Sequence, residues 1–81
     1  MTFDPGREIR DGVHDACWTD TDLWIASIAL GGSLDLGDVI AITAGDRPPT
    51  RRQYDVFAVA LNEHFADLGH DHPVPAWDGG S

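Results

Sequence analysis

The sequence predicts an all-α protein, a small three- to four-helix bundle with an extended N-terminal arm and a proline-containing C-terminal tail. The prediction rests first on residues 50–68, where hydrophobic residues recur at helical spacing between a capping sequence and a glycine. It rests second on two shorter apolar segments, near 20–30 and 34–44, which also lie between capping residues and glycines. An 81-residue chain with 42% hydrophobic residues is expected to form a single domain.

The N-terminal residues 1–16 are predicted to form an arm or, in the alternative, a short helix around residues 7–17. Ile9, Val13 and Cys17 lie four residues apart, which is the spacing of one helix face. Gly12 in the middle of that segment weakens a helix. The helical domain is therefore expected to span residues 17–69.

The first main helix is predicted over residues 20–30. Thr19, Asp20 and Thr21 are all suitable N-caps, and the glycine pair at 31–32 supplies a left-handed stop. From Leu23 to Leu30 every residue except Ser27 is apolar, so the helix has no polar face. Such a helix is expected to be buried on all sides, which in so short a chain requires neighbours all round or a second chain.

The second main helix is predicted over residues 34–44. Either Ser33 or Asp35 can cap it, and Gly45 ends it. The β-branched residues between Val39 and Thr43 leave a strand as the alternative.

The segment GGSLDLGDVIAI resembles the serine-leucine start of the second helix in acyl carrier proteins, which are also small, acidic and helical. The resemblance covers about a dozen residues, and it would imply phosphopantetheine on Ser33. The family has an aspartate before that serine, where this chain has Gly32, and a long loop where this chain has an apolar helix. We therefore expect Ser33 to cap the helix and no cofactor to be attached.

The last helix, residues 50–68, gives the clearest pattern. Thr50 and Gln53 form a capping box, and Gly69 closes the helix. One face is hydrophobic from Tyr54 to Leu68. The predicted core comprises Leu23, Trp24, Ile28, Leu30, Leu36, Val39, Ile40, Tyr54, Phe57, Leu61, Phe65 and Leu68.

Residues 70–81 are predicted to form an extended tail, since two residues in it precede prolines and are biased towards extended backbone. Trp77 is the large side chain expected to anchor the tail against the bundle.

The charge balance limits the classes of partner. Fourteen acidic residues against five arginines give a net charge of −9, which repels nucleic-acid phosphates and anionic membranes. A single cysteine excludes an internal disulfide. Because no segment resembles a signal peptide or approaches the length of a membrane span, the protein is expected to be cytoplasmic.

Neither a metal site nor an active site is predicted. The spacing of the histidines and Cys17 matches no strong zinc pattern, and whether His64, His70 and His72 bind a metal is left open. Ser27, Ser33 and Cys17 are available nucleophiles, but none lies in a recognisable catalytic motif. An enzyme is not expected.

The arginines near the last helix supply the candidate site. Arg47, Arg51 and Arg52 are three of the five cations in this acidic chain. They could bind a partner. Arg51 and Arg52 could instead read DNA with Gln53 as part of a helix-turn-helix, or simply pair locally with Asp55. The seven residues "AGDRPPT" between the helices are more than a helix-turn-helix uses, so DNA reading is the alternative.

The outward side of the same helix carries valines between charged residues, which suggests a contact surface unless the arm or the tail covers it. The predicted partner-binding residues are Arg51, Arg52, Val56, Val59 and Glu63. Together these features predict a small acidic interaction module, a regulatory or accessory subunit that binds a protein partner or itself as a homodimer. The alternative is a helix-turn-helix-like transcriptional regulator that uses Arg51, Arg52 and Gln53.

Overall fold

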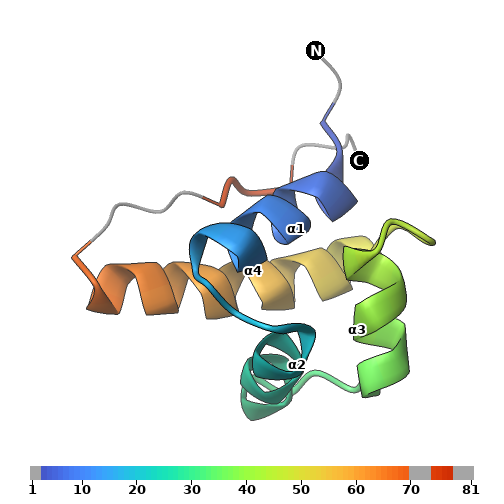
Figure 1. The fold of residues 1–81 in the computed structure, drawn as a ribbon, viewed down its shortest axis with the longest axis horizontal. Coiled ribbons are helices and arrows are strands. Elements are labelled where there is room, and N and C mark those ends of the chain that lie inside the picture. Colours follow the sequence, from blue (N-terminus) through green and yellow to red (C-terminus); the bar gives the residue numbers. More distant parts are fainter. Residues whose placement is uncertain (1–2, 70–73, 78–81) are drawn as a thin grey trace.

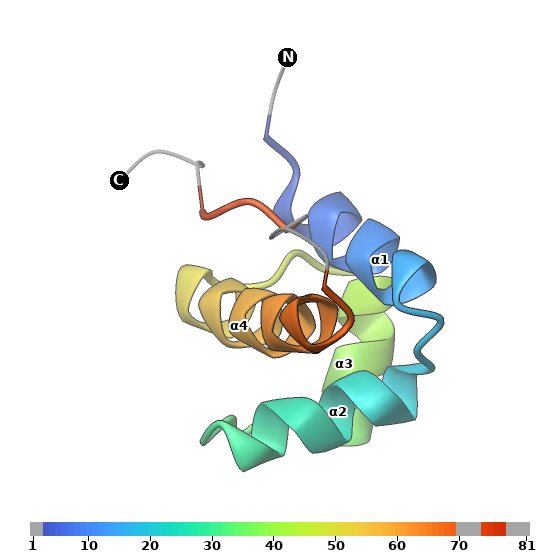
Figure 2. The ribbon, with the colours of Figure 1, turned by 90° about the vertical axis from the view of Figure 1, so that its left-hand side faces the viewer.

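The computed structural model describes residues 3–69 and 74–77, and within them the chain forms four α-helices and no strand. The helices are α1 (Pro5–Asp15), α2 (Asp20–Ala29), α3 (Leu36–Thr43) and α4 (Arg51–Asp67). The long helix α4 runs through the middle of the molecule, with α1 on one side of it and α2 on the other (Figures 1 and 2). Helix α2 packs against α3 and α4, and α1 packs against the same two helices. The predicted all-α class is confirmed.

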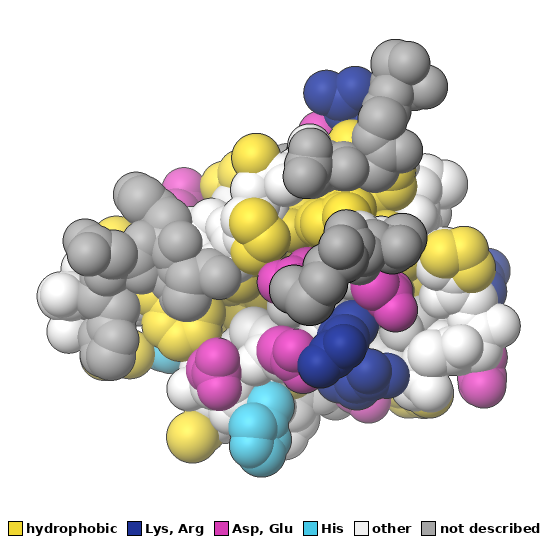
Figure 3. All heavy atoms as spheres, turned by 90° about the horizontal axis from the view of Figure 1, so that it is seen from above, with side chains coloured by type: hydrophobic (Ala, Val, Ile, Leu, Met, Phe, Trp, Pro, Cys, Tyr) yellow, Lys and Arg dark blue, Asp and Glu magenta, His cyan; other side chains and the backbone are white. Residues whose placement is uncertain are grey.

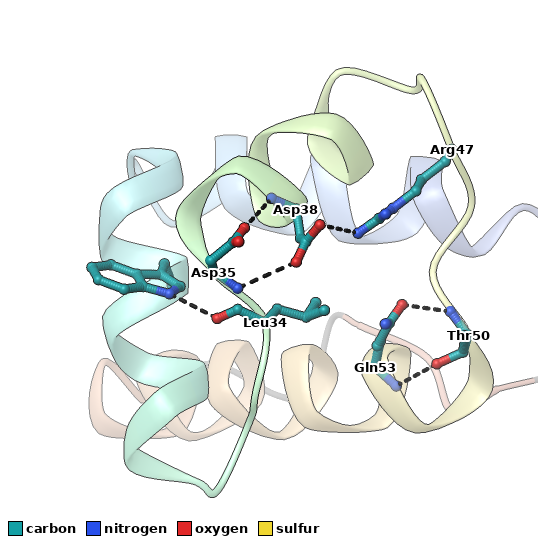
Figure 4. Close-up of polar contacts among 7 residues, drawn as sticks. Leu34, Asp35, Asp38, Arg47, Thr50 and Gln53 are labelled. Carbon is teal, nitrogen blue, oxygen red and sulfur yellow. Dashed lines mark hydrogen bonds and ion pairs between the residues drawn. The ribbon is translucent and has the colours of Figure 1, made fainter.

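The helices begin where local capping residues allow them to. The backbone N–H of Gln53 donates to Thr50 Oγ1 at 3.2 Å, and the Thr50 N–H donates to Gln53 Oε1 at 2.9 Å, as a capping box requires (Figure 4). Helix α3 is capped by Asp35, in a box with Asp38, and not by Ser33. The strand alternative for residues 39–43 is wrong, because this segment lies inside α3.

The helices end on left-handed residues. Gly31, Gly45 and Gly69 follow α2, α3 and α4 with φ values of 87°, 85° and 80°, as the sequence predicted. Helix α1 ends in the same way, but the left-handed residue is Cys17, with φ of 57°. This ending was missed by sequence analysis because no glycine marks it.

The N-terminal segment belongs to the core. Residues 5–15 form α1, and its Ile9 and Val13 are buried against the other helices. Gly12 lies where α1 crosses α4: a β-carbon there would come within 2.9 Å of Leu61 Cδ1 and of Val74 Cγ2. The glycine that weakens the helix in isolation therefore permits its close packing.

The hydrophobic core contains only part of the residues predicted for it. Six of the predicted residues are buried, and Trp24 and Leu36 are half-buried. Ile28, Leu30, Ile40 and Leu68 are exposed, so their placement in the core was wrong. Their places are taken by side chains from α1, α3, α4 and the tail: Ile9, Val13, Ile42, Ala58, Ala60 and Val74.

The described part of the tail packs on the α1 side of α4. Val74 is buried, its N–H donates to Asn62 Oδ1 at 3.2 Å, and its carbonyl accepts from Asn62 Nδ2 at 3.0 Å. Trp77 packs edge-on against Phe3 and Tyr54, with ring centroids 5.5 Å apart in both pairs, so the predicted anchor is confirmed. Figure 3 looks onto this face and shows hydrophobic side chains gathered at its centre. Residues 70–73 and 78–81 of the predicted tail lie outside the described residues.

Candidate interaction surface

Of the three arginines singled out from the sequence, Arg47 is tied to α3. Its Nη2 lies 2.8 Å from Asp38 Oδ1, the carboxylate that also caps α3 by accepting from the Asp35 N–H (Figure 4). The hydrogen bonds from Arg47 and from Asp35 hold the pKa of Asp38 below its usual value. Arg47 therefore links the connection between α3 and α4 to the first turn of α3.

Arg51 and Arg52 are exposed at the start of α4. The ion pairs within residues 3–69 and 74–77 are Arg7–Asp11 and Arg47–Asp38, so the predicted local pairs with Asp55 are not formed there. Within the described part of this acidic chain, neither guanidinium group forms an ion pair.

The predicted partner-binding residues on α4 fall into one strip and one outlier. Arg52, Val56, Val59 and Glu63 recur every three or four residues, whereas Arg51 lies about 100° round the helix from Arg52. Val59 is 47% exposed, and Val56 is half-buried beside α2.

The alternative that the arm or the tail covers this strip fails for the described residues. Residues 74–77 and α1 pack instead on the side of α4 that carries Tyr54 and Asn62. Ala60, which follows Val59 in the sequence, is buried and does not belong to the strip.

Helix α2 is turned so that its one polar residue within the apolar segment faces inwards. Ser27 is 2% exposed, and its hydroxyl donates to the carbonyl oxygen of Trp24 at 2.8 Å, which satisfies the group without another partner. Ile25 and Ile28 point outwards and are 57% and 45% exposed. The expectation that α2 is buried on all sides by this chain is therefore wrong.

The chain folds back tightly after α2. The Gly32 N–H donates to the Ser27 carbonyl oxygen at 2.8 Å, and a β-carbon on Gly32 would come within 2.7 Å of that oxygen, so the turn requires a glycine. The inward side of α2 is formed by Leu23 and Ser27, which are both buried. Helix α2 lies at the edge of the molecule opposite α1 (Figures 1 and 2). Its outer face is defined by its exposed residues: Thr21, Asp22, Ile25, Ile28 and Ala29.

A groove of about 280 Å³ lies between the end of α2 and Arg52. Leu30, Leu34, Val56 and Phe57 supply its apolar walls, and Arg52 and Gln53 supply polar atoms from the first turns of α4. Leu30 and Gly31 directly follow α2, so the groove lies at the C-terminal end of that helix. The sequence pattern of α4 predicts Arg52 and Val56 but not the groove, because only the tertiary fold brings Leu30 beside them.

The structure also shows the surroundings of three other residues that the sequence offered as candidates for DNA binding, metal binding or catalysis. The Oε1 atom of Gln53, one of the DNA-reading candidates, is bonded to the Thr50 N–H. The ring of His64 packs over Trp18, with centroids 4.8 Å apart. Ser33 lies in the connection before α3 and lines the groove.

No three potential metal ligands come together in the described residues, and His70 and His72 lie outside them. In the same residues, none of the helices combines the length and the hydropathy that crossing a membrane requires.

The site thus consists of an exposed apolar helix face, a groove at the C-terminal end of that helix, and Arg52 at the groove, without an ion pair among the described residues. Comparison of the chain with protein-family models, with curated proteins and with solved structures gave no match.

Proposed function

We propose that the chain is a small, acidic, non-enzymatic interaction module of the cytoplasm, a regulatory or accessory subunit that binds a protein partner or a second copy of itself. The observation that carries the proposal is the orientation of α2, which buries Ser27 and exposes Ile25 and Ile28. A helix that serves only its own core would show the reverse arrangement.

Exposed apolar side chains are concentrated on α2 and its C-terminal end. Ile25, Ile28 and Leu30 lie along one helix and its end, and Ile40 is exposed on the neighbouring helix α3. Burying the exposed half of an isoleucine stabilises a complex by about 1 kcal/mol. Several such side chains in one region are the usual mark of a protein-protein contact.

Arg52 would make the surface selective for one class of partner. An apolar contact alone is not selective, whereas an unpaired cation at the rim favours partners that carry an acidic group at the matching place. Val56, half-buried in the groove beside Arg52, would supply apolar contact area next to that charge. The strip of α4 predicted from the sequence is thus the charged border of the surface and α2 is its centre.

Capture from a native lysate tests the proposal. The tagged wild type is compared with Ile25→Lys, with Arg52→Ala/Val56→Asp, and with the control Leu68→Lys, which changes an equally exposed leucine, 58% against 57%. We expect the wild type and the control to retain the same partner, and the other two variants to lose it while they keep the helical circular dichroism of the wild type. A partner that all four forms retain equally would contradict the proposal.

DNA reading by the start of α4 is the second candidate, and the unpaired state of Arg51 and Arg52 favours it. The net charge of −9 opposes it. Two results together would support DNA binding. The affinity of the wild type for DNA would fall steeply with salt, and the Arg51→Ala/Arg52→Ala variant would lose that affinity.

A further inference from the structure

We infer that the partner is a second copy of this chain, and that the two copies pair through α2 in antiparallel orientation. The inference rests on the proposed function and names its occupant. It follows from the way in which charged and apolar groups are distributed along α2 and around its two ends.

The two ends of the α2 surface carry opposite charges. Asp20 and Asp22 lie in the first turn of α2, and Asp22 is exposed. The other end leads through Leu30 into the groove, where Arg52 of α4 lies. Between these ends, the outer face carries Ile25 and Ile28 and no cation. The surface therefore needs a partner with an apolar middle, an acid at one end and a cation at the other.

A second copy of α2 has this pattern. When two such helices pack antiparallel about a two-fold axis, Ile25 of each copy lies against Ile28 of the other. Asp22 of each copy then lies at the end of the other where Leu30 and Arg52 are found, about 12 Å along the helix. Two equivalent acid-arginine pairs form, one at each end of the contact. Parallel packing would instead place the two Asp22 carboxylates side by side, so charge selects the antiparallel pair.

The carboxylate of Asp22 can accept a further hydrogen bond in this contact. Its Oδ2 accepts from the Thr19 N–H at 2.9 Å, in the capping box, and a carboxylate has two oxygens with further capacity to accept. Asp20 is less available, because its Oδ1 accepts from the hydroxyl of Thr43 at 2.8 Å.

The expected dimer is weak and reversible. One helix of ten residues presents less than the roughly 800 Å² per partner of a standard interface. Two copies with a charge of −9 also repel each other. At about 0.15 M salt the screening length is about 8 Å, which weakens that long-range repulsion but leaves contacts between neighbouring groups. A dissociation constant of roughly 10–100 µM is expected.

Sedimentation equilibrium of the purified full chain, from about 10 µM to about 1 mM, tests the inference over the range where such an interface associates. The wild type should shift from the monomer mass towards twice that mass. Ile25→Lys and Ile28→Lys should remain monomeric, while the control Leu68→Lys should associate like the wild type. Circular dichroism confirms that each variant is folded, as is expected for substitutions at side chains this exposed.

A matched pair of arginine variants tests the orientation. Arg52→Glu and Arg51→Glu change the net charge equally, but only Arg52 lies at the groove. We expect Arg52→Glu to weaken association roughly tenfold and Arg51→Glu about twofold or less. Equal effects of the two variants would overturn the antiparallel pairing.

A wild type that stays monomeric at about 1 mM, or that dimerises equally well with lysine at position 25, would overturn self-association through α2. The proposed function fails separately: it stands if a different protein is captured from the lysate in an Ile25-dependent way, and it falls if no partner of either kind is found.

Discussion

Cys17 ends α1 in a backbone conformation that favours glycine. Its N–H donates to the carbonyl of His14, and the N–H of Trp18 donates to the carbonyl of Val13, which together form the hydrogen bonds of a Schellman motif. The residue in the left-handed position has φ of 57° and carries a β-carbon that this conformation disfavours. The side chain itself is exposed. Cys17 is thus held in place by the motif at a cost in conformational energy.

Replacing Cys17 by glycine should therefore stabilise the protein, by about 0.5–1 kcal/mol. Urea unfolding followed by circular dichroism measures the effect. Cys17→Ala is the control, since it removes the thiol but keeps the β-carbon, and it should change the free energy of unfolding by less than about 0.5 kcal/mol. Equal stabilisation by both substitutions would show that the thiol, and not the backbone, is responsible.

Tyr54 is the single tyrosine of the chain, and its ring is fully buried. Burial, and then the charges of Glu8 and Asp55, raise its pKa to about 12. A pKa raised in the folded state means that this group contributes stability below pH 10, which is lost as the pH rises from 10 towards 12. The absorbance of tyrosinate should accordingly appear near pH 12 in the folded protein, and Tyr54→Phe should lessen the loss of stability above pH 10. Ionisation at pH 10 without unfolding would contradict this burial.

At the scale of elements, the crossing of α1 and α4 depends on Gly12. Helix propensity alone predicts that alanine at this position would stabilise α1 by about 1 kcal/mol. The added β-carbon, however, would lie 2.9 Å from Leu61 and from Val74, which are both buried. We expect the overlap to dominate and Gly12→Ala to destabilise the protein by about 1–2 kcal/mol.

Thermal unfolding of Gly12→Ala, Val74→Ala and the double variant checks this prediction. The double variant should be more stable than the sum of the single effects implies, because alanine at position 74 removes one of the two close contacts. Additive effects would show that the two residues are not in contact.

The ends of the helices could be predicted from the sequence because they depend on neighbours in the chain. Thr50 with Gln53, and the glycines at 31, 45 and 69, act within one turn of their own helix. The side of a helix that faces the core could be predicted only where charged residues mark the other side, as they do in α4. Helix α2 has no such marks between Leu23 and Leu30, and the expectation that its isoleucine at position 28 is buried was therefore wrong.

The candidate site was predicted in part for the same reason. The strip with Arg52, Val56 and Val59 follows from the pattern of α4 alone. The groove does not, because Leu30 reaches Val56 only through the packing of α2 on α4. Likewise, no local pattern indicates that Asn62 binds the backbone of Val74, which lies 12 residues further along the chain.

At the scale of the whole molecule, the tail is held to the bundle by the paired hydrogen bonds between Asn62 and Val74. Asn62→Asp keeps the size of the side chain but replaces its donor by a carboxylate oxygen facing the carbonyl of Val74. We expect a loss of about 1–3 kcal/mol in the free energy of unfolding. Hydrogen exchange at the Val74 N–H should also accelerate. The control Asp67→Asn, exposed on the same helix, should have an effect within about 0.5 kcal/mol.

The contact between Phe3 and Trp77 brings the first and last described residues onto one face, with the rings 5.5 Å apart and α2 on the opposite side (Figures 1 and 2). We therefore expect the packing of the helices not to depend on their covalent order. A circular permutant that joins residue 81 to residue 1 and opens the exposed connection at residues 44–48 would read α4, α1, α2, α3 along its chain. Every contact made by the outer face of α2 would be retained in such a permutant.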